Sequence, residues 1–195
     1  MPKDQDVVMC CKIVVLGDSG VGKTSLANRW INGVWQDSVK PTIGANHQRK
    51  RVQIDRNNLD VFMWDTAGQE QFRSLAPVYT RSSSAVIIVA SIIERASFES
   101  IENWIEIVKS TSEKMPPLVL AVNKIDLPDA VINQEEIIEK YKPLFAGIFF
   151  TSALSGQEVD QCFRCASEEA YKFIKDSQQV ESKQLDAEKQ KSGCC

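Results

Sequence analysis

Short apolar stretches alternate along this chain with segments in which apolar side chains recur at helical spacing. Four stretches are almost wholly apolar and rich in β-branched residues, which is typical of strands buried on both faces of a parallel sheet. These expected strands are Val7–Leu16, Val86–Ala90, Leu118–Val122 and Ile148–Phe150. The expected helices lie between or after them, at Thr24–Trp30, Phe98–Lys109, Gln134–Tyr141 and Val159–Ile174. Alternating strands and helices predict βαβ units.

One segment has a different pattern, in which apolar and polar residues alternate within each of two neighbouring expected strands. Val52–Asp55 and Leu59–Trp64 flank the polar turn Arg56-Asn57-Asn58, which predicts an antiparallel hairpin. We therefore expect an α/β fold of three layers, with a six-stranded, mostly parallel sheet, one antiparallel strand, and helices on both faces.

The chain divides by composition into a domain and a tail. Its 195 residues suffice for one domain with a sizeable core, which we place at residues 1–175. From Asp176 the apolar content falls and Ser, Gln, Glu and Lys dominate, so residues 176–195 are expected to form a flexible tail. No apolar run approaches the roughly 18 residues of a membrane span, and we expect the folded part to be cytosolic.

Charge and cysteine content disfavour nucleic-acid binding and zinc binding. With 23 basic and 26 acidic residues the net charge is −3, which disfavours nucleic-acid binding. The six cysteines and single histidine cannot supply four zinc ligands at suitable spacing. We instead expect Cys10, Cys11, Cys162 and Cys165 to pack in the core.

The first chemical motif is a glycine-rich loop between an expected strand and an expected helix. Gly17-x-x-x-x-Gly22-Lys23-Thr24 lets backbone N–H groups surround a phosphate at the positive end of a helix. Lys23 adds a charge for the β- and γ-phosphates, and the Thr24 hydroxyl can ligate Mg²⁺. A turn with two structural glycines is the alternative. The expected phosphate-binding residues are Asp18, Ser19, Gly20, Val21, Gly22, Lys23, Thr24 and Ser25.

A second motif, Asp65-Thr66-Ala67-Gly68-Gln69, follows the strand that ends at Trp64. Asp65 is placed to hold the magnesium shell, Gly68 to approach a γ-phosphate, and Gln69 to orient an attacking water. We expect Lys23, Gly68 and Gln69 to act in catalysis. Taken singly, an aspartate here is usually a cap and a loop glutamine is usually solvated.

A third motif, Asn123-Lys124-Ile125-Asp126, closes another apolar strand and predicts the base. A buried Asp126 carboxylate can accept both the ring N–H and the amine of guanine, whereas adenine would leave it unsatisfied. Asn123 would brace the loops and Lys124 would lie on the base plane. In Thr151-Ser152-Ala153 the Ala153 N–H would bind the guanine oxygen.

Together these motifs and their spacing resemble the Ras-like small GTPases over about residues 8 to 175. Trp64–Glu70 and the pair Cys194-Cys195 are similar to the Rab branch. The resemblance implies the P-loop NTPase fold and GTP, GDP and Mg²⁺ as ligands. It implies that Thr42 is the switch I threonine, ligating Mg²⁺ and contacting the γ-phosphate only with GTP bound. Trp35 falls where the family places an aromatic over the guanine, with a core role as the alternative.

Three positions refine or depart from the Rab pattern. Ser74–Tyr79 is similar to switch II of the endosomal Rab subgroup. His47 stands where the family usually has the phenylalanine of an effector-facing aromatic triad with Trp64 and Tyr79, so effector identity is open. Leu154 replaces a more usual lysine beside the base, a tolerable change because the Ala153 backbone makes the contact; Ser152 and Leu154 are kept as base-site residues.

The resemblance also implies a switch mechanism and its partners. Loss of the γ-phosphate would release the segments held by Thr42 and Gly68. Because such sites hydrolyse GTP slowly alone, we expect an activating protein and an exchange factor, with effectors that bind switches I and II. Stable membrane attachment takes two lipid signals, and two prenyl groups on Cys194 and Cys195 would satisfy it. A prenyltransferase escort and a GDP-dissociation inhibitor follow from this.

The implied role is regulation of vesicle traffic, in a protein cycling between cytosol and the cytoplasmic face of endomembranes. Switch II favours the early endosome, and a secretory or Golgi Rab is the alternative. A scaffold that keeps GTP without hydrolysing it is disfavoured by Gln69. A P-loop kinase is disfavoured because Asp126 demands guanine and Gln69 suits water.

Overall fold

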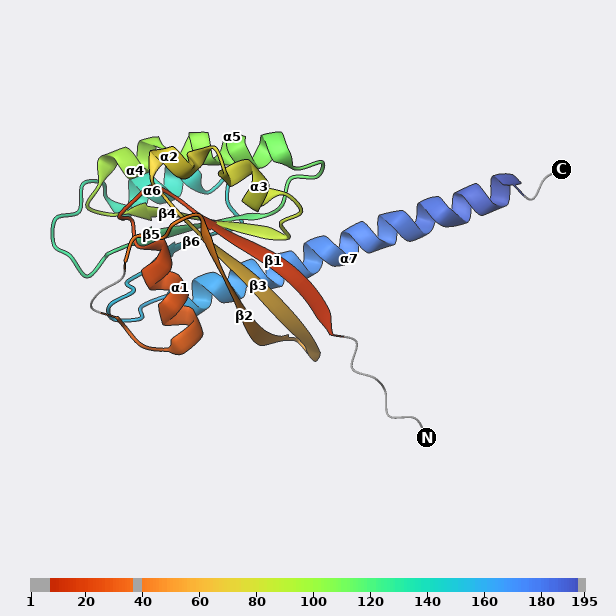
Figure 1. The fold of residues 1–195 in the computed structure, drawn as a ribbon, viewed down its shortest axis with the longest axis horizontal. Helices are drawn as coiled ribbons and strands as arrows, with labels where there is room; N and C mark the ends of the chain where they lie inside the picture. The colour runs from red at the N-terminus through yellow and green to blue at the C-terminus, as the bar shows by residue number, and fades with distance from the viewer. Residues whose placement is uncertain (1–7, 37–39, 193–195) are drawn as a thin grey trace.

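The computed structural model describes residues 8–36 and 40–192, without the side chains of residues 70, 71 and 180 onward. Its six-stranded sheet has the order β2-β3-β1-β4-β5-β6 (Figure 1). All neighbouring strands are parallel except β2 and β3, which pair antiparallel. The predicted fold class is therefore confirmed. The strands are β1 Met9–Leu16, β2 Ala45–Ile54, β3 Asn57–Thr66, β4 Ala85–Ser91, β5 Leu118–Asn123 and β6 Gly147–Phe150.

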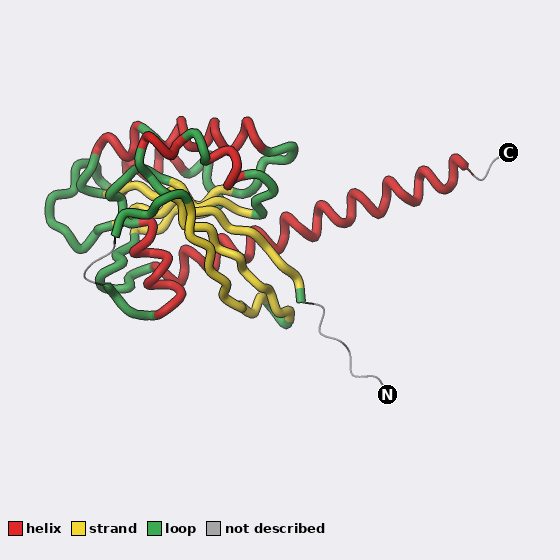
Figure 2. Tube along the Cα trace, in the orientation of Figure 1, coloured by secondary structure: helices red, strands yellow, loops and turns green. Residues whose placement is uncertain are grey.

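Helices cover both faces of the sheet (Figures 1 and 2). One face packs on α1 and α7, through a core that includes Trp30 and Phe163, whose rings stack. The other face carries α2 to α6, with Trp104 and Tyr141 among its buried side chains. The helices are α1 Lys23–Asn32, α2 Glu70–Arg73, α3 Ala76–Thr80, α4 Arg95–Glu99, α5 Ile101–Thr111, α6 Gln134–Tyr141 and α7 Val159–Ser192.

The β2–β3 hairpin turns more tightly than the sequence indicates. Ile54 pairs with Asn57, so the two turn residues are Asp55 and Arg56, and both asparagines belong to β3. Asp55 has a φ of +54°, in the left-handed region that aspartate tolerates better than most side chains. The turn therefore begins one residue before the predicted turn Arg56-Asn57-Asn58 and is one residue shorter.

Two short helices, α2 and α3, interrupt a segment for which the sequence predicted no element. Each has at most five residues, too few to show helical periodicity. The single helix expected at Phe98–Lys109 is instead two, because α4 ends at Glu99 and α5 begins at Ile101. Both corrections concern the helical layer and leave the sheet order unchanged.

The segment after Asp176 differs from the predicted tail, since α7 continues without a break to Ser192 (Figure 2). Its Glu, Lys, Gln, Ala and Leu residues are good helix formers, and a low apolar content does not oppose a solvent-exposed helix. The helix leads away from the body of the domain (Figure 1). No described helix, α7 included, is both long and apolar enough to cross a membrane.

The expectation that the cysteines pack in the core holds for Cys11 and Cys162, and in part for Cys165, which packs against the same core cluster. Cys11 and Cys162 are buried, and burial raises the pKa of both thiols, to about 12 for Cys11. Cys165 is half-buried, and Cys10 is exposed. The core prediction for Cys10 is wrong because neighbouring side chains of a strand point to opposite faces, and at this end of β1 one face is open.

Candidate functional site

The glycine-rich loop begins directly where β1 ends at Leu16, at the carboxyl edge of the parallel strands. Gly17 has a φ of +141°, and a Cβ there would lie 2.3 Å from the Val89 carbonyl oxygen of β4. Gly22 has a φ of +97°, and its Cβ would lie 2.3 Å from Asn123 Nδ2. A side chain at either position would break the contact of the loop with its neighbours.

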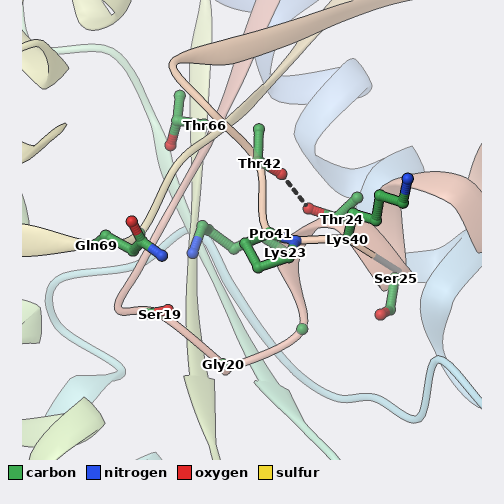
Figure 3. Close-up of a pocket in the computed structure, with 12 residues that line it drawn as sticks. Ser19, Gly20, Lys23, Thr24, Ser25, Lys40, Pro41, Thr42, Thr66 and Gln69 are labelled. Carbon is green, nitrogen blue, oxygen red and sulfur yellow. Dashed lines mark hydrogen bonds between the residues drawn. The ribbon is translucent and has the colours of Figure 1, made fainter. Parts of the chain in front are cut away.

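This loop forms one wall of a cavity of about 290 Å³ (Figure 3). Residues 40–42 and the segment after β3 form the other walls. Lys40, Pro41 and Thr66 also line the cavity, although no role was predicted for them. The Thr66 hydroxyl donates to the Val15 carbonyl, a contact between β3 and β1. The lining residues are Ser19, Gly20, Gly22, Lys23, Thr24, Ser25, Lys40, Pro41, Thr42, Thr66, Gly68 and Gln69.

Lys23 is the first residue of α1, and its side chain extends into this cavity; the residue is 5% exposed. Its ammonium donates to the Asp18 carbonyl at 2.6 Å. Burial lowers its pKa to about 8, while Asp65 and Asp18 act in the opposite direction. An anionic group in the cavity would stabilise the charged form of Lys23, which burial alone disfavours. The buried lysine therefore suits the cavity to an anion.

Three oxygen-bearing side chains meet beside Lys23. The Thr24 and Thr42 hydroxyls are 2.8 Å apart (Figure 3), and the Thr42 hydroxyl donates to Asp65 Oδ2 at 3.4 Å. Asp65 is fully buried, and burial raises its pKa. Its Oδ1 has no hydrogen-bond partner among the described residues. A buried carboxylate oxygen left without a partner beside two hydroxyls fits the oxygen ligand set of a hard divalent cation.

The segment after β3 approaches the glycine-rich loop very closely at Gly68. A Cβ on Gly68 would lie 2.2 Å from Lys23 Nζ and 2.5 Å from the Asp18 carbonyl oxygen. Gln69 caps the N-terminus of α2, and its side chain and that of Lys23 extend toward one another in Figure 3. Gly68 and Gln69 therefore face the cavity together with the lysine.

Asn123 joins the glycine-rich loop to the loop after β6. Its Nδ2 donates to the Val21 carbonyl at 2.9 Å, and its Oδ1 accepts from Thr151 Oγ1 and Ala153 N, both at 3.3 Å. It is 1% exposed. The Ala153 N–H, expected to bind a ligand oxygen, is thus already hydrogen-bonded within the protein.

The other residues predicted around a base lie outside the lining of this cavity. Asp126 is exposed, which corrects the expectation of a buried carboxylate: the loop after β5 carries it beyond the sheet edge. Lys124 has a φ of +68°, Ser152 is buried, and Leu154 is 51% exposed. Trp35 is 37% exposed, which argues against the alternative that it is a core residue.

His47 occupies a surface formed by aromatic side chains. Its ring stacks on Phe62 with centroids 5.6 Å apart and contacts Trp64 at 5.5 Å, and Trp64 in turn contacts Tyr79 at 6.1 Å. Histidine therefore lies beside Trp64 and Tyr79, at the position where the resemblance to Rabs implies a phenylalanine. Phe62 is an additional member that the sequence did not indicate.

The sheet order, the glycine-rich loop and the polar cluster at the strand ends define a P-loop nucleotide-binding domain. A family model described as the Ras family matches residues 12–172. The chain therefore belongs to the Ras family, as the motifs predicted, and its relatives place it among the Rab-type small GTPases.

Those relatives carry Rab names and match most of the domain. The Ras-related protein RABG3f of Arabidopsis thaliana is 36% identical over 83% of this chain and 82% of its own length. Human Ras-related protein Rab-22A is 38% identical over 78% and 79%, and the putative Ras-related protein Rab-5B of Dictyostelium discoideum 35% identical over 78% and 71%. As a member of this family the protein is a guanine-nucleotide-binding GTPase.

Proposed function

We propose that Thr24, Thr42 and Asp65 hold Mg²⁺ beside the phosphates of GTP and that this cluster is the switch of the protein. The observation that carries the proposal is the buried, unpartnered Oδ1 of Asp65 beside two hydroxyls 2.8 Å apart. When bound, the ion would neutralise phosphate charge. Asp65 is fixed by β3, whereas Thr42 comes from the segment before β2, so a contact made by both couples that segment to the ligand.

On the phosphate side, the loop from Asp18 to Ser25 would hold the phosphates through its backbone N–H groups and the α1 N-terminus. The Lys23 ammonium would bind the β- and γ-phosphates, and Gln69 would orient the attacking water. Gly68, where a Cβ would lie 2.2 Å from Lys23 Nζ, lets the backbone of this segment approach the lysine closely, and we place the γ-phosphate beside it. Catalysis here is electrostatic stabilisation and positioning, with water as the acceptor.

On the base side, Asp126 would accept the two guanine donors. Because this carboxylate is exposed in the protein alone, a bound base must itself exclude water from it for strong discrimination. Lys124 and Trp35 would lie on the two faces of the base. Asn123 acts indirectly, by holding the loops that carry Ser152, Ala153 and Leu154.

Hydrolysis would release Thr42 and Gly68 from the lost γ-phosphate, so the two switch segments would change conformation together. The aromatic cluster of His47, Phe62, Trp64 and Tyr79 lies next to these segments and is our candidate effector surface. An exchange factor and an activating protein would set the nucleotide state. Cys194 and Cys195 lie outside the described residues; we retain their prenylation, with escort and GDP-dissociation inhibitor, as a prediction.

The cellular role of the proposal is control of vesicle traffic at endomembranes, and we favour the early endocytic pathway. Support for this compartment is the likeness of Ser74–Tyr79 to endosomal Rabs and similarity to proteins named Rab-22A and Rab-5B. Localisation of the N-terminally tagged protein against endosomal and Golgi markers tests it. Golgi labelling would refute the endocytic assignment and leave the GTPase assignment intact.

The switch itself is tested with Thr42→Ala against Thr42→Ser, which keeps the hydroxyl. With Mg²⁺ present we expect Thr42→Ala to weaken binding of a non-hydrolysable GTP analogue by about tenfold, the worth of one charge-assisted contact. GDP affinity should change by less than about twofold, and Thr42→Ser should behave like wild type. Equal weakening of GDP and GTP binding by Thr42→Ala would contradict the switch role.

A further inference from the structure

The side chain of Asp18, in the glycine-rich loop, joins two elements that are remote in sequence. Asp18 Oδ1 accepts a hydrogen bond from Arg73 Nη2 at 2.9 Å and another from Trp104 Nε1 at 3.0 Å. Arg73 ends α2 and Trp104 lies in α5. The Arg73 guanidinium also lies over the Trp104 ring, 4.8 Å from its centroid. Each of the three side chains contacts the other two.

This triad is more enclosed than the exposed ion pair of Lys109 and Glu106. The side chain of Asp18 is 18% exposed and that of Arg73 32%, whereas both partners of the Lys109–Glu106 pair are about 70% exposed. Trp104 is 2% exposed, so it forms a fixed floor under the guanidinium. Reduced solvent screening makes such a pair stronger than a surface pair. Buried Arg73 Nε, however, has no partner in the described part of the chain.

The backbone carbonyl of Asp18 makes contacts of its own, with Lys23 and with Gly68. The carbonyl accepts from Lys23 Nζ, and Gly68 packs so closely that a Cβ would lie 2.5 Å from that carbonyl. The segment from Gly68 to Arg73 therefore contacts Asp18 at both ends. Gly68 packs against the Asp18 backbone carbonyl, and Arg73 pairs with the Asp18 side chain. Gln69 lies within this six-residue segment.

We propose that Arg73 is a positioning residue for hydrolysis, which holds Gln69 over the phosphate site through its ion pair with Asp18. The inference deepens the proposed function and rests on it. Arg73 is absent from the described residues that line the cavity, so it acts through Asp18 and α2 and not on the phosphates. Trp104 fixes the orientation of both charged partners. The Nε of Arg73 has no hydrogen-bond partner among the described residues, so a protein that binds switch II can readily displace Arg73 from this position.

The test compares Arg73→Gln with Arg81→Gln in the full chain. Arg81 is an exposed residue just after α3 whose hydrogen bond to Lys12 is made by its backbone carbonyl, so Arg81→Gln removes the same charge without touching Asp18. Both variants and wild type are loaded with GTP for single-turnover hydrolysis. GDP dissociation and hydrogen exchange of residues 69–75 with a bound GTP analogue are measured alongside.

We expect Arg73→Gln to slow intrinsic hydrolysis by about tenfold, because small misplacement of a catalytic group is costly. Exchange at residues 69–75 should rise, and GDP dissociation should change by less than about twofold. Arg81→Gln should match wild type in all three. Trp104→Phe keeps the apolar floor and removes the donor to Asp18, so it should give a smaller effect in the same direction; it and Arg73→Lys carry the test if Arg73→Gln does not fold.

Two results would overturn the proposal. One is wild-type hydrolysis by Arg73→Gln with GDP binding intact. The other is a loss of hydrolysis matched by an equal acceleration of GDP release, which would mean general loosening of the site. Failure of the wild-type protein to bind guanine nucleotide would instead refute the proposed function, so the two failures are distinguishable.

Discussion

Replacing Asn123 with alanine should weaken nucleotide binding while leaving the fold in place. The change removes one hydrogen bond of 2.9 Å to the Val21 carbonyl and two of 3.3 Å, from Thr151 and Ala153. A net hydrogen bond is worth about 1 kcal/mol, and each buried group left without a partner costs about 1–3 kcal/mol. With two long bonds among the three, we estimate a total of about 3 kcal/mol.

This cost should fall on the nucleotide site, because Asn123 is the link between the phosphate-binding loop and the loop after β6. Binding would have to restore their relative position, so about 3 kcal/mol corresponds to a GDP dissociation constant roughly 100-fold higher. Fluorescent GDP titration measures it. The matched control is Asn133→Ala, which removes the N-cap bond of α6 to the Glu136 N–H and should cost about 1 kcal/mol of stability without changing GDP affinity.

A second variant tests the same contact from its other side. A Cβ on Gly22 would lie 2.3 Å from Asn123 Nδ2, so Gly22→Ala should also displace this side chain. The two substitutions should therefore be non-additive when combined. A folded Asn123→Ala protein that binds GDP as tightly as wild type would refute the reasoning.

Three further outcomes are expected. Gly68→Ala should weaken GTP-analogue binding at least about tenfold and suppress hydrolysis, since its Cβ would lie 2.2 Å from the P-loop lysine; wild-type hydrolysis would contradict this. Exposed Cys10 should react with a thiol reagent in the native protein, whereas Cys162, whose pKa is raised by burial, should react only on unfolding, as mapped by mass spectrometry. Changing Cys194 and Cys195 to serine together should release the protein from membranes with nucleotide binding intact; retention on membranes would exclude the lipid anchor.

The sheet and the position of the glycine-rich loop could be predicted because their signals are local. An apolar run that stops at Gly17 fixes both a buried strand and the edge at which the loop begins. The register of the hairpin could not be predicted in this way, since Asp55 adopts a positive φ that frees Asn57 for the strand. The exposure of Asp126 depends on how far its loop extends beyond the sheet, which spacing does not reveal.

Contacts between distant residues were the least predictable part of the site. Arg73 and Trp104 lie 55 and 86 positions from Asp18, and neither has a sequence signature beyond a charge and an aromatic ring on a helical face. The helix beyond residue 176 was not predicted for a different reason. Low apolar content indicated a flexible tail, but helix propensity in solvent depends on the backbone and on side-chain entropy and not on apolar content.

Two of the contacts that hold the glycine-rich loop are separate from one another, and this separation has a kinetic consequence. Asn123 binds the Val21 carbonyl on the side of the loop after β6, and the Asp18 side chain binds Arg73 and Trp104 on the side of α2 and α5. The two contacts share no partner. The double variant Asn123→Ala/Arg73→Gln should therefore show the nucleotide affinity of Asn123→Ala and the hydrolysis rate of Arg73→Gln, with no further loss in either quantity. Strong coupling would mean that the loop moves as one rigid unit, and release and hydrolysis could not then be tuned independently.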